Sequence, residues 1–362
     1  MKKRKIKILY FVEAMGGGVF TYMVNLANNL NNNFDVYIAY ATRPQTPTDF
    51  KKYFNSNIHL IEVKNYKREV SFKDVSAFFE MKKIAKRVNP DIIHLHSSKS
   101  GLLGRFAFNG KKTPLFYTPH GYSFLIENIS KSKKMFYRFL EKIAASRNCT
   151  TISCSYGENE ETKKLTSRAV YVDNGIDLNN ITHILKNMSD RTEKKKTVFT
   201  IGRISPQKDP SMFNEIAKRF PNLNFIWIGD GNLNNLLAAK NIKITGWLKA
   251  NQALKIAAKC DVFVLTSLWE GLPMSLLESM YMRKICVVSN VIGNNNVIKN
   301  NVNGFLCNSL DDYCSAIKKA IYGEEKEKIK NKAYNDIITH YNSIYMAKEY
   351  MKIYTDSLEK IN

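Results

Sequence analysis

The stretch Asp261-Val-Phe-Val-Leu-Thr266, followed closely by Trp269-Glu-Gly-Leu-Pro-Met-Ser-Leu-Leu-Glu278, decides the fold class of this chain. Its first part is a short apolar run, which predicts a buried β-strand. Pro273 in the second part suits the first turn of a helix, where its missing N–H costs nothing. A buried strand that leads through a short loop into a helix is typical of α/β proteins.

The start of this helix has the features of an anion-binding site. Amides at a helix start have no partner within the helix and point out of it, which suits a negatively charged group. Here we expect them to come from Gly271, Leu272 and Met274. Glu270 on the loop and Glu278 on the helix flank these amides and could accept hydrogen bonds from sugar hydroxyls. The alternative is an ordinary strand-loop-helix unit with surface glutamates.

Strands and helices alternate in the same way along the chain, which predicts parallel sheets with helices on both faces. A first series has strands at residues 6–12, 35–40, 58–63, 91–95, 115–118, 150–154 and 170–173. A second series has strands at residues 197–201, 224–228, 242–245, 261–266 and 285–289. Helical segments follow over residues 310–362.

The chain of 362 residues exceeds what one hydrophobic core usually supports, so we expect two domains. We predict an α/β protein with two Rossmann-like, doubly wound domains that face a cleft, followed by C-terminal helices. The domains are residues 1–186 and 197–340, joined by a polar linker at residues 187–196. A last helix, at residues 341–362, is expected to return to the first domain.

The composition is basic, with 55 Lys and Arg against 32 Asp and Glu and a formal net charge of +23. Such an excess implies an anionic partner, such as nucleic acid, anionic lipid or a phosphorylated substrate, or it reflects the preference of an AT-rich genome for Lys and Asn. The chain contains no RNP, KH or zinc-finger pattern, so we expect no nucleic-acid partner.

The start Met-Lys-Lys-Arg-Lys is basic, but the apolar segment behind it, residues 6–12, is too short for a signal peptide. No apolar run reaches the ~18 residues that a membrane-spanning helix needs. We therefore expect a cytoplasmic protein. The six cysteines include no C-x-x-C pair, so we expect reduced and mostly buried thiols.

A second candidate site is Gly202-Arg-Ile-Ser-Pro-Gln-Lys-Asp209, which follows the first strand of the second series. Arg203 and Lys208 could converge on one anion, the arginine as a planar fork and the lysine as a point charge. A departing diphosphate needs such neutralisation. The alternative is two solvated loop cations, which are common in so basic a chain.

Two more loops follow strands of the first series. Gly17 and Gly18 could let the backbone approach a phosphate or sugar closely, or they belong to a tight turn. His120 would face the cleft and could bind a sugar hydroxyl or shuttle a proton, or it is a core histidine. His94 and His96 share one face of their strand, and we expect His94 in the core.

Several motifs are absent from the sequence. It has no D-x-D pair to hold a metal against a diphosphate, no P-loop and no G-x-S-x-G elbow. We therefore expect no metal and no cofactor.

Taken together, these motifs resemble glycosyltransferase family 4, whose members are retaining enzymes of the GT-B fold. The E-x7-E signature is formed by Glu270 and Glu278, with Gly-Leu-Pro where many members have Gly-Phe-Gly. Further matching elements are Gly16–Gly18, Asp91-Ile-Ile-His, Lys99-Ser-Gly-Leu-Leu-Gly-Arg105, Asn174-Gly-Ile-Asp177, Gly202-Arg with Lys208, Gly229-Asp-Gly231 and Thr245-Gly-Trp-Leu248. The similarity spans nearly the whole chain, and the order and spacing of the motifs are specific.

The resemblance implies how the second domain binds a donor. Glu278 would bind the ribose, and Glu270, with the amides of Gly271 and Leu272, would bind the transferred sugar. The backbone of the Gly246, Trp247 and Leu248 segment would read the base.

The resemblance also implies the groups around the reacting bond. Arg203 and Lys208 would hold the diphosphate. Gly17 and Gly18 of the first domain would close on the donor, and His120 would touch the sugar or the acceptor. With Glu270, the two cations and the histidine are the catalytic candidates.

The partners implied are a nucleotide-sugar donor, UDP- or dTDP-linked, and a polyprenyl-diphosphate-linked saccharide or growing polysaccharide. Such enzymes work at the cytoplasmic membrane face in capsule, O-antigen or exopolysaccharide synthesis. In a retaining reaction the departing phosphate can help deprotonate the acceptor, so the protein supplies mainly charge and positioning. A nucleotide-sugar epimerase on the same fold remains an alternative, and it would release no nucleotide in response to an acceptor. A sugar phosphorylase would need pyridoxal phosphate, for which no lysine context argues.

A membrane partner is suggested by Ser130-Lys-Ser-Lys-Lys-Met-Phe-Tyr-Arg-Phe-Leu-Glu-Lys142. This segment sets apolar side chains among basic ones, as in helices that bind an anionic membrane surface. The apolar side chains are Met135, Phe136, Phe139 and Leu140. The alternative is a core helix with a solvated basic face.

Overall fold

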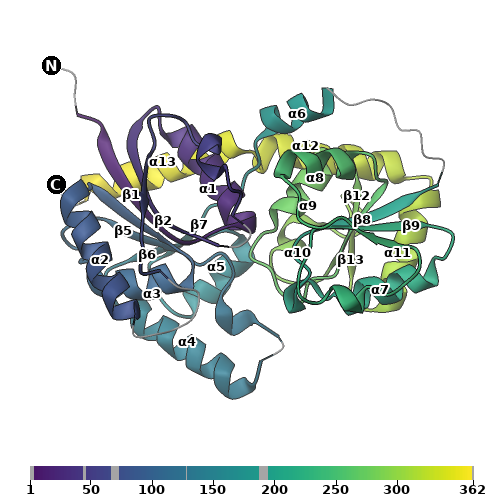
Figure 1. Cartoon of the computed structure of the whole chain (residues 1–362), viewed down its shortest axis with the longest axis horizontal. Coiled ribbons are helices and arrows are strands. Elements are labelled where there is room, and N and C mark those ends of the chain that lie inside the picture. Colours follow the sequence, from purple (N-terminus) through teal and green to yellow (C-terminus); the bar gives the residue numbers. More distant parts are fainter. Residues whose placement is uncertain (1–3, 44–45, 67–72, 128, 187–194, 361–362) are drawn as a thin grey trace. The chain divides into compact units, whose positions relative to one another are not determined.

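The computed structural model of the chain describes residues 4–43, 46–66, 73–127, 129–186 and 195–360. These residues form two compact units, each a parallel sheet with helices packed on it (Figure 1). The first unit spans residues 1–125, 129–174 and 343–362, and the second spans residues 126–128 and 175–342. The expected α/β architecture with two Rossmann-like domains is therefore confirmed.

The first unit contains a seven-stranded parallel sheet in the order β3-β2-β1-β4-β5-β6-β7. Its strands are β1 (Ile6–Met15), β2 (Phe34–Thr42), β3 (His59–Glu62), β4 (Ile92–His96), β5 (Leu115–Thr118), β6 (Thr150–Ser153) and β7 (Ala169–Tyr171). Its helices are α1 (Gly17–Leu30), α2 (Lys73–Val88), α3 (Ser98–Ala107), α4 (Lys131–Ala145), α5 (Tyr156–Lys163) and α13 (Ser343–Glu359), with 3-10 turns η1 (Phe50–Tyr53) and η2 (Ser123–Leu125). All strands expected from this part of the sequence are present.

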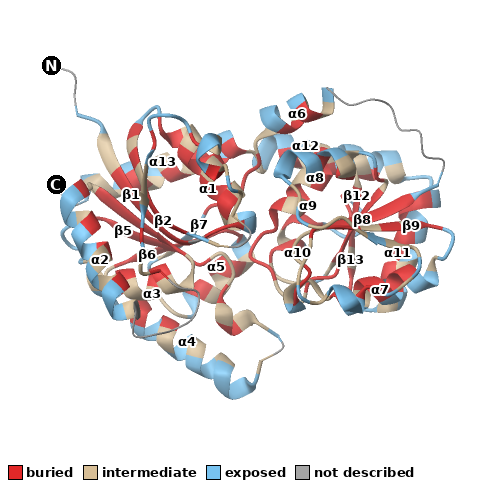
Figure 2. Cartoon of the chain, viewed as in Figure 1, coloured by how far each residue is buried: buried red, intermediate tan, exposed pale blue. Residues whose placement is uncertain are grey.

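The central strand β1 is buried on both faces, which explains its continuous apolar sequence. Ile8 and Tyr10 pack on one side with residues of α1 and α13. Leu9 and Phe11 pack on the other side, where α2 supplies much of the cover. Figure 2 shows the resulting buried centre of the sheet. This alternation is the reason why the first unit needs helices on both faces.

The second unit contains a six-stranded parallel sheet in the order β10-β9-β8-β11-β12-β13. Its strands are β8 (Thr197–Ile201), β9 (Asn224–Ile228), β10 (Ile242–Ile244), β11 (Val262–Leu265), β12 (Ile285–Ser289) and β13 (Phe305–Cys307). Its helices are α6 (Leu178–Lys186), α7 (Pro210–Arg219), α8 (Ala250–Ala258), α9 (Met274–Tyr281), α10 (Asn294–Val297), α11 (Leu310–Tyr322) and α12 (Lys326–His340), with 3-10 turns η3 (Pro206–Lys208) and η4 (Asn234–Leu236). Strand β13 was not expected from the sequence.

The boundaries of the units differ from the expected domain limits. Helix α6 belongs to the second unit, where Thr182 and Tyr281 share a hydrogen bond between their hydroxyls (2.5 Å). The chain therefore passes between the units near Asn174 and not after residue 186. Residues 187–194 of the expected linker lie outside the described residues. Helix α13 belongs to the first unit, where Tyr350 and Tyr354 are fully buried.

None of the helices within the described residues combines the length and the apolar character needed to cross a membrane. All six cysteines are free thiols, and all except Cys314 are buried. Burial raises the pKa of the Cys149 thiol to about 12. Buried thiols of this kind serve as small apolar core residues.

Candidate active site

Loops from neighbouring strands meet at the carboxyl edge of the second sheet. The loops after β8 and β9 are joined by a hydrogen bond from the amide of Ile204 to the carbonyl of Asp230 (2.8 Å). The loops after β11 and β12 touch at Gly293, where an added Cβ would lie 2.4 Å from the carbonyl oxygen of Gly271. Gly293 is therefore required for this close approach. The edge forms one continuous platform at the place where ligands bind in open α/β sheets.

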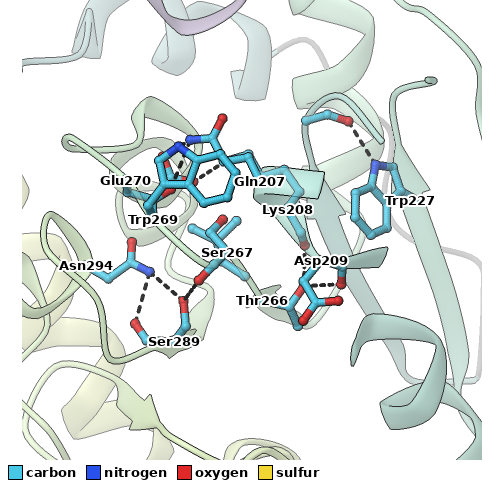
Figure 3. Close-up of polar contacts among 12 residues, drawn as sticks. Gln207, Lys208, Asp209, Trp227, Thr266, Ser267, Trp269, Glu270, Ser289 and Asn294 are labelled. Carbon is cyan, nitrogen blue, oxygen red and sulfur yellow. Dashed lines mark hydrogen bonds and ion pairs between the residues drawn. The ribbon is translucent and has the colours of Figure 1, made fainter. Parts of the chain in front are cut away.

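The two motifs singled out in this half of the sequence lie side by side on the platform (Figure 3). The amide of Leu268 donates to the carbonyl of Gln207 (2.8 Å), and the side-chain amide of Gln207 donates to the carbonyl of Trp269 (2.9 Å). The hydroxyl of Thr266 donates to the carbonyl of Lys208 (2.7 Å). These bonds fix the loop after β8 against the loop after β11, independently of the charged side chains.

Lys208 and Glu270 form an ion pair, with Nζ 2.5 Å from Oε1. Only 15% of the lysine side chain and 7% of the glutamate side chain are exposed. The second carboxylate oxygen of Glu270 lies 3.4 Å from Nε2 of Gln207. Lys208 retains two N–H donors for an anion, and Glu270 retains lone pairs for hydroxyl groups. From the sequence, these two residues belonged to separate motifs. In the structure their side chains form one ion pair.

The β11–α9 connection differs in one detail from the expected geometry. Helix α9 begins at Met274, and Pro273 is its N-cap residue in an extended conformation. Gly271 and Leu272 therefore belong to the loop before the helix, and Met274 provides the first amide of the helix itself.

Glu278 lies on α9, half-buried, and its carboxylate makes no hydrogen bond or ion pair with any described residue. Burial raises the pKa of this carboxyl from its usual 4.5 to about 7. A carboxylate without partners in such a position is costly for the folded protein. It is also free to accept hydrogen bonds from a ligand.

The remaining donor-binding candidates of the second unit occupy the same edge. Gly246, Trp247 and Leu248 follow β10, and Trp247 is 54% exposed. The hydroxyl of Thr245 accepts from the amide of Gly229 (3.1 Å), which ties this turn to the loop after β9. Arg203 is half-buried on the loop that carries Lys208.

In the first unit, the candidates Gly17, Gly18 and His120 follow β1 and β5 at the carboxyl edge of that sheet. Gly17 has a φ of +57°, so its backbone conformation favours glycine, and an added Cβ would meet no atom within 4 Å. Both glycines are exposed at the start of α1. Tyr22 of the same helix packs edge-on against the ring of His120, with ring centroids 4.6 Å apart.

Burial lowers the pKa of His120 to about 3, so its imidazole is neutral at physiological pH. His120 as a whole residue is half-buried, and its Nε2 lies 3.0 Å from Nδ1 of His96. His94 is fully buried, as expected from the sequence. The turn that carries His120 is held by the buried carboxylate of Glu158, which accepts from the amide of Gly121 (2.6 Å).

Sequence reasoning missed the residues that hold the charged groups in place. Gln207 lies within the quoted Gly202–Asp209 motif but received no role, because its partners belong to a distant loop. Asn294 donates to the carbonyl and hydroxyl oxygens of Ser289 (3.0 and 3.1 Å) at the base of the loop after β12. The available signal was the Gly293-Asn294 pair in the loop that follows the apolar strand at residues 285–289.

Comparison with known proteins identifies the family of this chain. The family model described as Glycosyltransferase Family 4 matches residues 16–180, and the model described as Glycosyl transferases group 1 matches residues 183–336. An Escherichia coli protein named UDP-Gal:alpha-D-GlcNAc-diphosphoundecaprenol alpha-1,3-galactosyltransferase is 32% identical over 339 residues, covering 84% of this chain and 85% of its own.

A Campylobacter jejuni alpha-1,4-N-acetyl-D-galactosaminyltransferase, whose name gives an undecaprenol-linked acceptor, is 26% identical over 87% of this chain and 88% of its own. Among solved structures, sucrose-phosphate synthase from Thermosynechococcus elongatus matches with a TM-score of 0.81 at 14% identity, covering 99% of this chain and 100% of that one. The family matches cover both units, and the structural likeness covers the whole fold. The chain therefore belongs to glycosyltransferase family 4 and is a glycosyltransferase with the GT-B fold.

Proposed function

We propose that this glycosyltransferase transfers a sugar from a UDP- or dTDP-linked donor to an undecaprenyl-diphosphate-linked saccharide, with retention of configuration. The observation that carries the proposal is the platform at the carboxyl edge of the second sheet. It combines a neutralised Lys208–Glu270 pair with the unpartnered carboxylate of Glu278. A nucleotide sugar offers complementary groups to both: hydroxyls for the carboxylates and a diphosphate for the lysine.

In this proposal Glu278 accepts hydrogen bonds from the ribose hydroxyls. The raised pKa of its carboxyl supports this role, because two hydroxyl donors would replace the solvation that burial removes. The backbone of Gly246, Trp247 and Leu248 contacts the base. Trp247 in this turn is exposed, so its ring offers a flat apolar surface to a ligand.

Lys208 and Arg203 stabilise the diphosphate as it departs, together with the amides of Gly271 and Leu272. Charge develops on the diphosphate when the bond to the sugar breaks, and preorganised donors then lower the barrier. The hydrogen bonds between the loops keep Lys208 in place before the donor arrives. Activity without a bound metal remains part of the proposal.

Retention is supported by the state of Glu270. One oxygen of the Glu270 carboxylate faces Lys208 and the other faces Gln207. A carboxylate held in this way is suited to binding hydroxyls of the transferred sugar, which leaves the proton of the acceptor to the departing phosphate. The departing phosphate then assists in deprotonating the acceptor on the face that it leaves. His120 and the exposed Gly17–Gly18 turn of the first unit are proposed to contact the sugar or the acceptor.

The proposed class of acceptor rests on the names of two relatives. The names of both the Escherichia coli and the Campylobacter jejuni protein give undecaprenol-linked acceptors. This supports a place in the assembly of a bacterial surface polysaccharide, such as capsule or O-antigen. The epimerase alternative is not supported, since both matching family models describe glycosyltransferases.

The test is nucleotide release from a panel of UDP-, dTDP- and GDP-sugars, with and without extracted polyprenyl-linked saccharides. We expect release from one UDP- or dTDP-sugar that depends on the lipid-linked acceptor, and NMR of the product should show the same anomeric configuration as in the donor. Release that needs no acceptor, or a product of inverted configuration, would contradict the proposal. A thermal shift with UDP, dTDP and GDP identifies the base beforehand, since ligand at ~100 times its Kd stabilises by ~2.7 kcal/mol.

We also propose that α4 docks on the anionic face of the membrane that holds the acceptor. The helix packs on the first unit through its buried residues Glu141, Ala144 and Ala145 and through the half-buried Tyr137, which contacts the apolar core. Glu141 forms a buried ion pair with Arg105 (2.7 Å). Four of the larger apolar residues are exposed: Met135 to 72%, Phe136 to 55%, Phe139 to 59% and Ile143 to 41%, whereas Leu140 of the predicted apolar set is half-buried. A core helix with a solvated basic face would instead bury its large apolar side chains.

The charges of α4 favour an anionic bilayer. Its only acidic residue, Glu141, is buried, whereas Lys131, Lys133 and Lys142 are exposed. Each basic side chain near such a surface contributes about 1 kcal/mol, weakened by salt, and exposed aromatic rings add apolar burial. Figure 2 shows the long exposed surface of this helix.

Vesicle flotation tests the docking. The protein should float with vesicles that contain anionic phospholipid, less at high salt, and should not float with neutral ones. Phe136→Ser with Phe139→Ser should reduce flotation strongly. The matched control is Tyr322→Ser, which removes a 71% exposed aromatic ring from the second unit and should leave flotation unchanged. Equal binding to neutral vesicles, or full binding by the double variant, would contradict the proposal.

A further inference from the structure

A connected group of histidines and tyrosines is buried beneath His120 in the first unit. His94 and His96 lie on β4, fully buried, with ring centroids 4.1 Å apart. Tyr350 and Tyr354 of α13 close the group from the C-terminal end of the chain, and both are fully buried. In a buried group of this kind each polar atom needs a partner, so the positions of the protons can be worked out from the hydrogen bonds.

The protons around His94 have one consistent arrangement. Thr118 donates its hydroxyl proton to the carbonyl of Ile152 (2.8 Å), so its oxygen must accept from Nε2 of His94 (2.9 Å). Burial lowers the pKa of His94, so the ring is neutral and its Nδ1 carries no proton. Nδ1 therefore accepts from the hydroxyl of Tyr354 (2.6 Å), which in turn accepts from Tyr10 (3.3 Å). Both nitrogens of His94 are satisfied, and the residue is structural.

His96 differs from His94 because only one of its nitrogens is bonded. Its Nδ1 lies 3.0 Å from Nε2 of His120, and its Nε2 is buried with no hydrogen-bond partner among the described residues. Burial lowers the pKa of both imidazoles, so both are neutral and only one of the two facing nitrogens carries a proton. A buried N–H without an acceptor is rarer in proteins than an unused acceptor. The proton of His96 is therefore on Nδ1, and its Nε2 is bare.

We propose that His96 is a positioning residue, which donates its Nδ1–H to Nε2 of His120 and thereby fixes His120 as the tautomer that carries its proton on Nδ1. Which nitrogen of a histidine is protonated depends on the bond that the other nitrogen makes. The consequence is that Nδ1 of His120, which bonds to no described residue, presents an N–H donor to a ligand and not a lone pair.

The neighbouring rings hold the imidazole of His120 so that Nε2 stays directed at His96 and is not available to a ligand. The imidazole stacks on His96 with an interplanar angle of 23°, and Tyr22 packs against it edge-on at 75°. The backbone at His120 has a φ of +57°, a left-handed conformation that the bond between Gly121 and Glu158 maintains. His120 is thus built to donate to an oxygen atom of a ligand and is not suited to accept a proton. That the oxygen belongs to a sugar or phosphate rests on the proposed function.

The tautomer is measured without any reaction. The chain has six histidines, so a protein labelled with 15N-histidine gives a simple spectrum of ring nitrogens, and a His120→Gln variant assigns the signals of interest. We expect a protonated Nδ1 and a bare Nε2 in His120 of the wild-type protein. In His96→Phe this pattern should be lost or averaged between two tautomers. A protonated Nε2 in the wild type, or an unchanged pattern in His96→Phe, would overturn the proposal.

Kinetics then test the positioning role. Loss of one hydrogen bond that orients a reacting group should lower kcat/KM by about three- to tenfold, while the thermal shift produced by UDP stays unchanged. His96→Asn should restore most of the activity, because its amide can donate in place of Nδ1–H. The matched control is Tyr350→Phe, which removes the bond from Tyr22 (2.6 Å) in the same core and should leave both the spectrum and kcat/KM unchanged.

The outcomes separate the two proposals. If the tautomer shifts in His96→Phe while kcat/KM does not, the positioning role is wrong. If no donor or acceptor supports turnover but the spectra are as expected, the proposed function fails and the tautomer assignment stands.

Discussion

Replacing Glu278 by glutamine should make the second unit more stable at high pH and less able to bind the donor nucleotide. Burial raises the pKa of the Glu278 carboxyl to about 7, against 4.5 in an unfolded chain. The folded pKa is the higher one, so the stabilisation due to this group is complete below pH 4.5 and is lost as the pH rises through 7. At pH 8 the wild-type protein keeps an ionised, half-buried carboxylate without a partner.

A pKa difference of that size corresponds to about 3 kcal/mol at most, and solvent that reaches the half-buried side chain reduces it to about 1–2 kcal/mol. Glutamine has nearly the same shape and does not titrate. Relative to wild type, Glu278→Gln should therefore gain about 1–2 kcal/mol in free energy of unfolding between pH 5 and pH 8.

The assay is denaturation followed by tryptophan fluorescence. All three tryptophans, Trp227, Trp247 and Trp269, belong to the second unit, so the signal reports the unit that contains Glu278. Glu324→Gln, an exposed change in the same unit, is the matched control and should show no such pH dependence.

UDP or dTDP binding to Glu278→Ala should be at least about tenfold weaker, since charge-assisted hydrogen bonds contribute roughly 1.5–3 kcal/mol each. A Glu278→Gln variant that gains no stability relative to wild type between pH 5 and pH 8 would contradict a raised pKa of the Glu278 carboxyl. The donor-binding role is refuted separately by near-wild-type nucleotide affinity in Glu278→Ala.

Three further outcomes are expected. Arg203→Ala and Lys208→Ala should each lower kcat by ~10²–10³ with a smaller change in donor KM. Arg203→Lys should recover only part of the loss, and the loss in the double variant should fall short of the product of the single losses. Steady-state kinetics that show changes in KM alone would mean that the two cations only anchor the ground state. Glycosyl transfer should survive EDTA, and a strict need for Mg²⁺ or Mn²⁺ in the same assay would contradict the proposed metal independence. Gly17→Ala should destabilise the first unit by about 1 kcal/mol in thermal denaturation, because its φ of +57° disfavours a side chain, and an unchanged midpoint would count against that strain.

The sequence by itself was sufficient for the fold class and most of the strands. Strands buried on both faces are continuous apolar runs, so segments such as Leu115–Thr118, Thr197–Ile201 and Asn224–Ile228 could be bounded from their own residues. Strand β13, Phe305–Cys307, was missed. It directly follows the polar stretch at residues 299–304 and exists through its pairing with β12.

The sequence also identified the motifs that form the platform, because each motif is a local run of residues at the end of a strand. Its chemistry could not be read locally. The ion pair between Lys208 and Glu270 joins residues 62 positions apart, and it shows that the two motifs act on each other as well as on a ligand. Likewise, the pKa of Glu278 depends on how deeply α9 packs, which no residue type reveals.

Only the tertiary structure decided which face of α4 is buried and how His120 is held. The apolar residues of α4 predict burial equally well on the core or on a membrane, and the choice depends on Arg105, 36 positions away from its partner Glu141. The group beneath His120 depends on α13, whose Tyr354 bonds to His94 across 260 positions. Local sequence fixes which faces are apolar and where a chain turns, whereas pairing between distant side chains is set by the packing of whole elements.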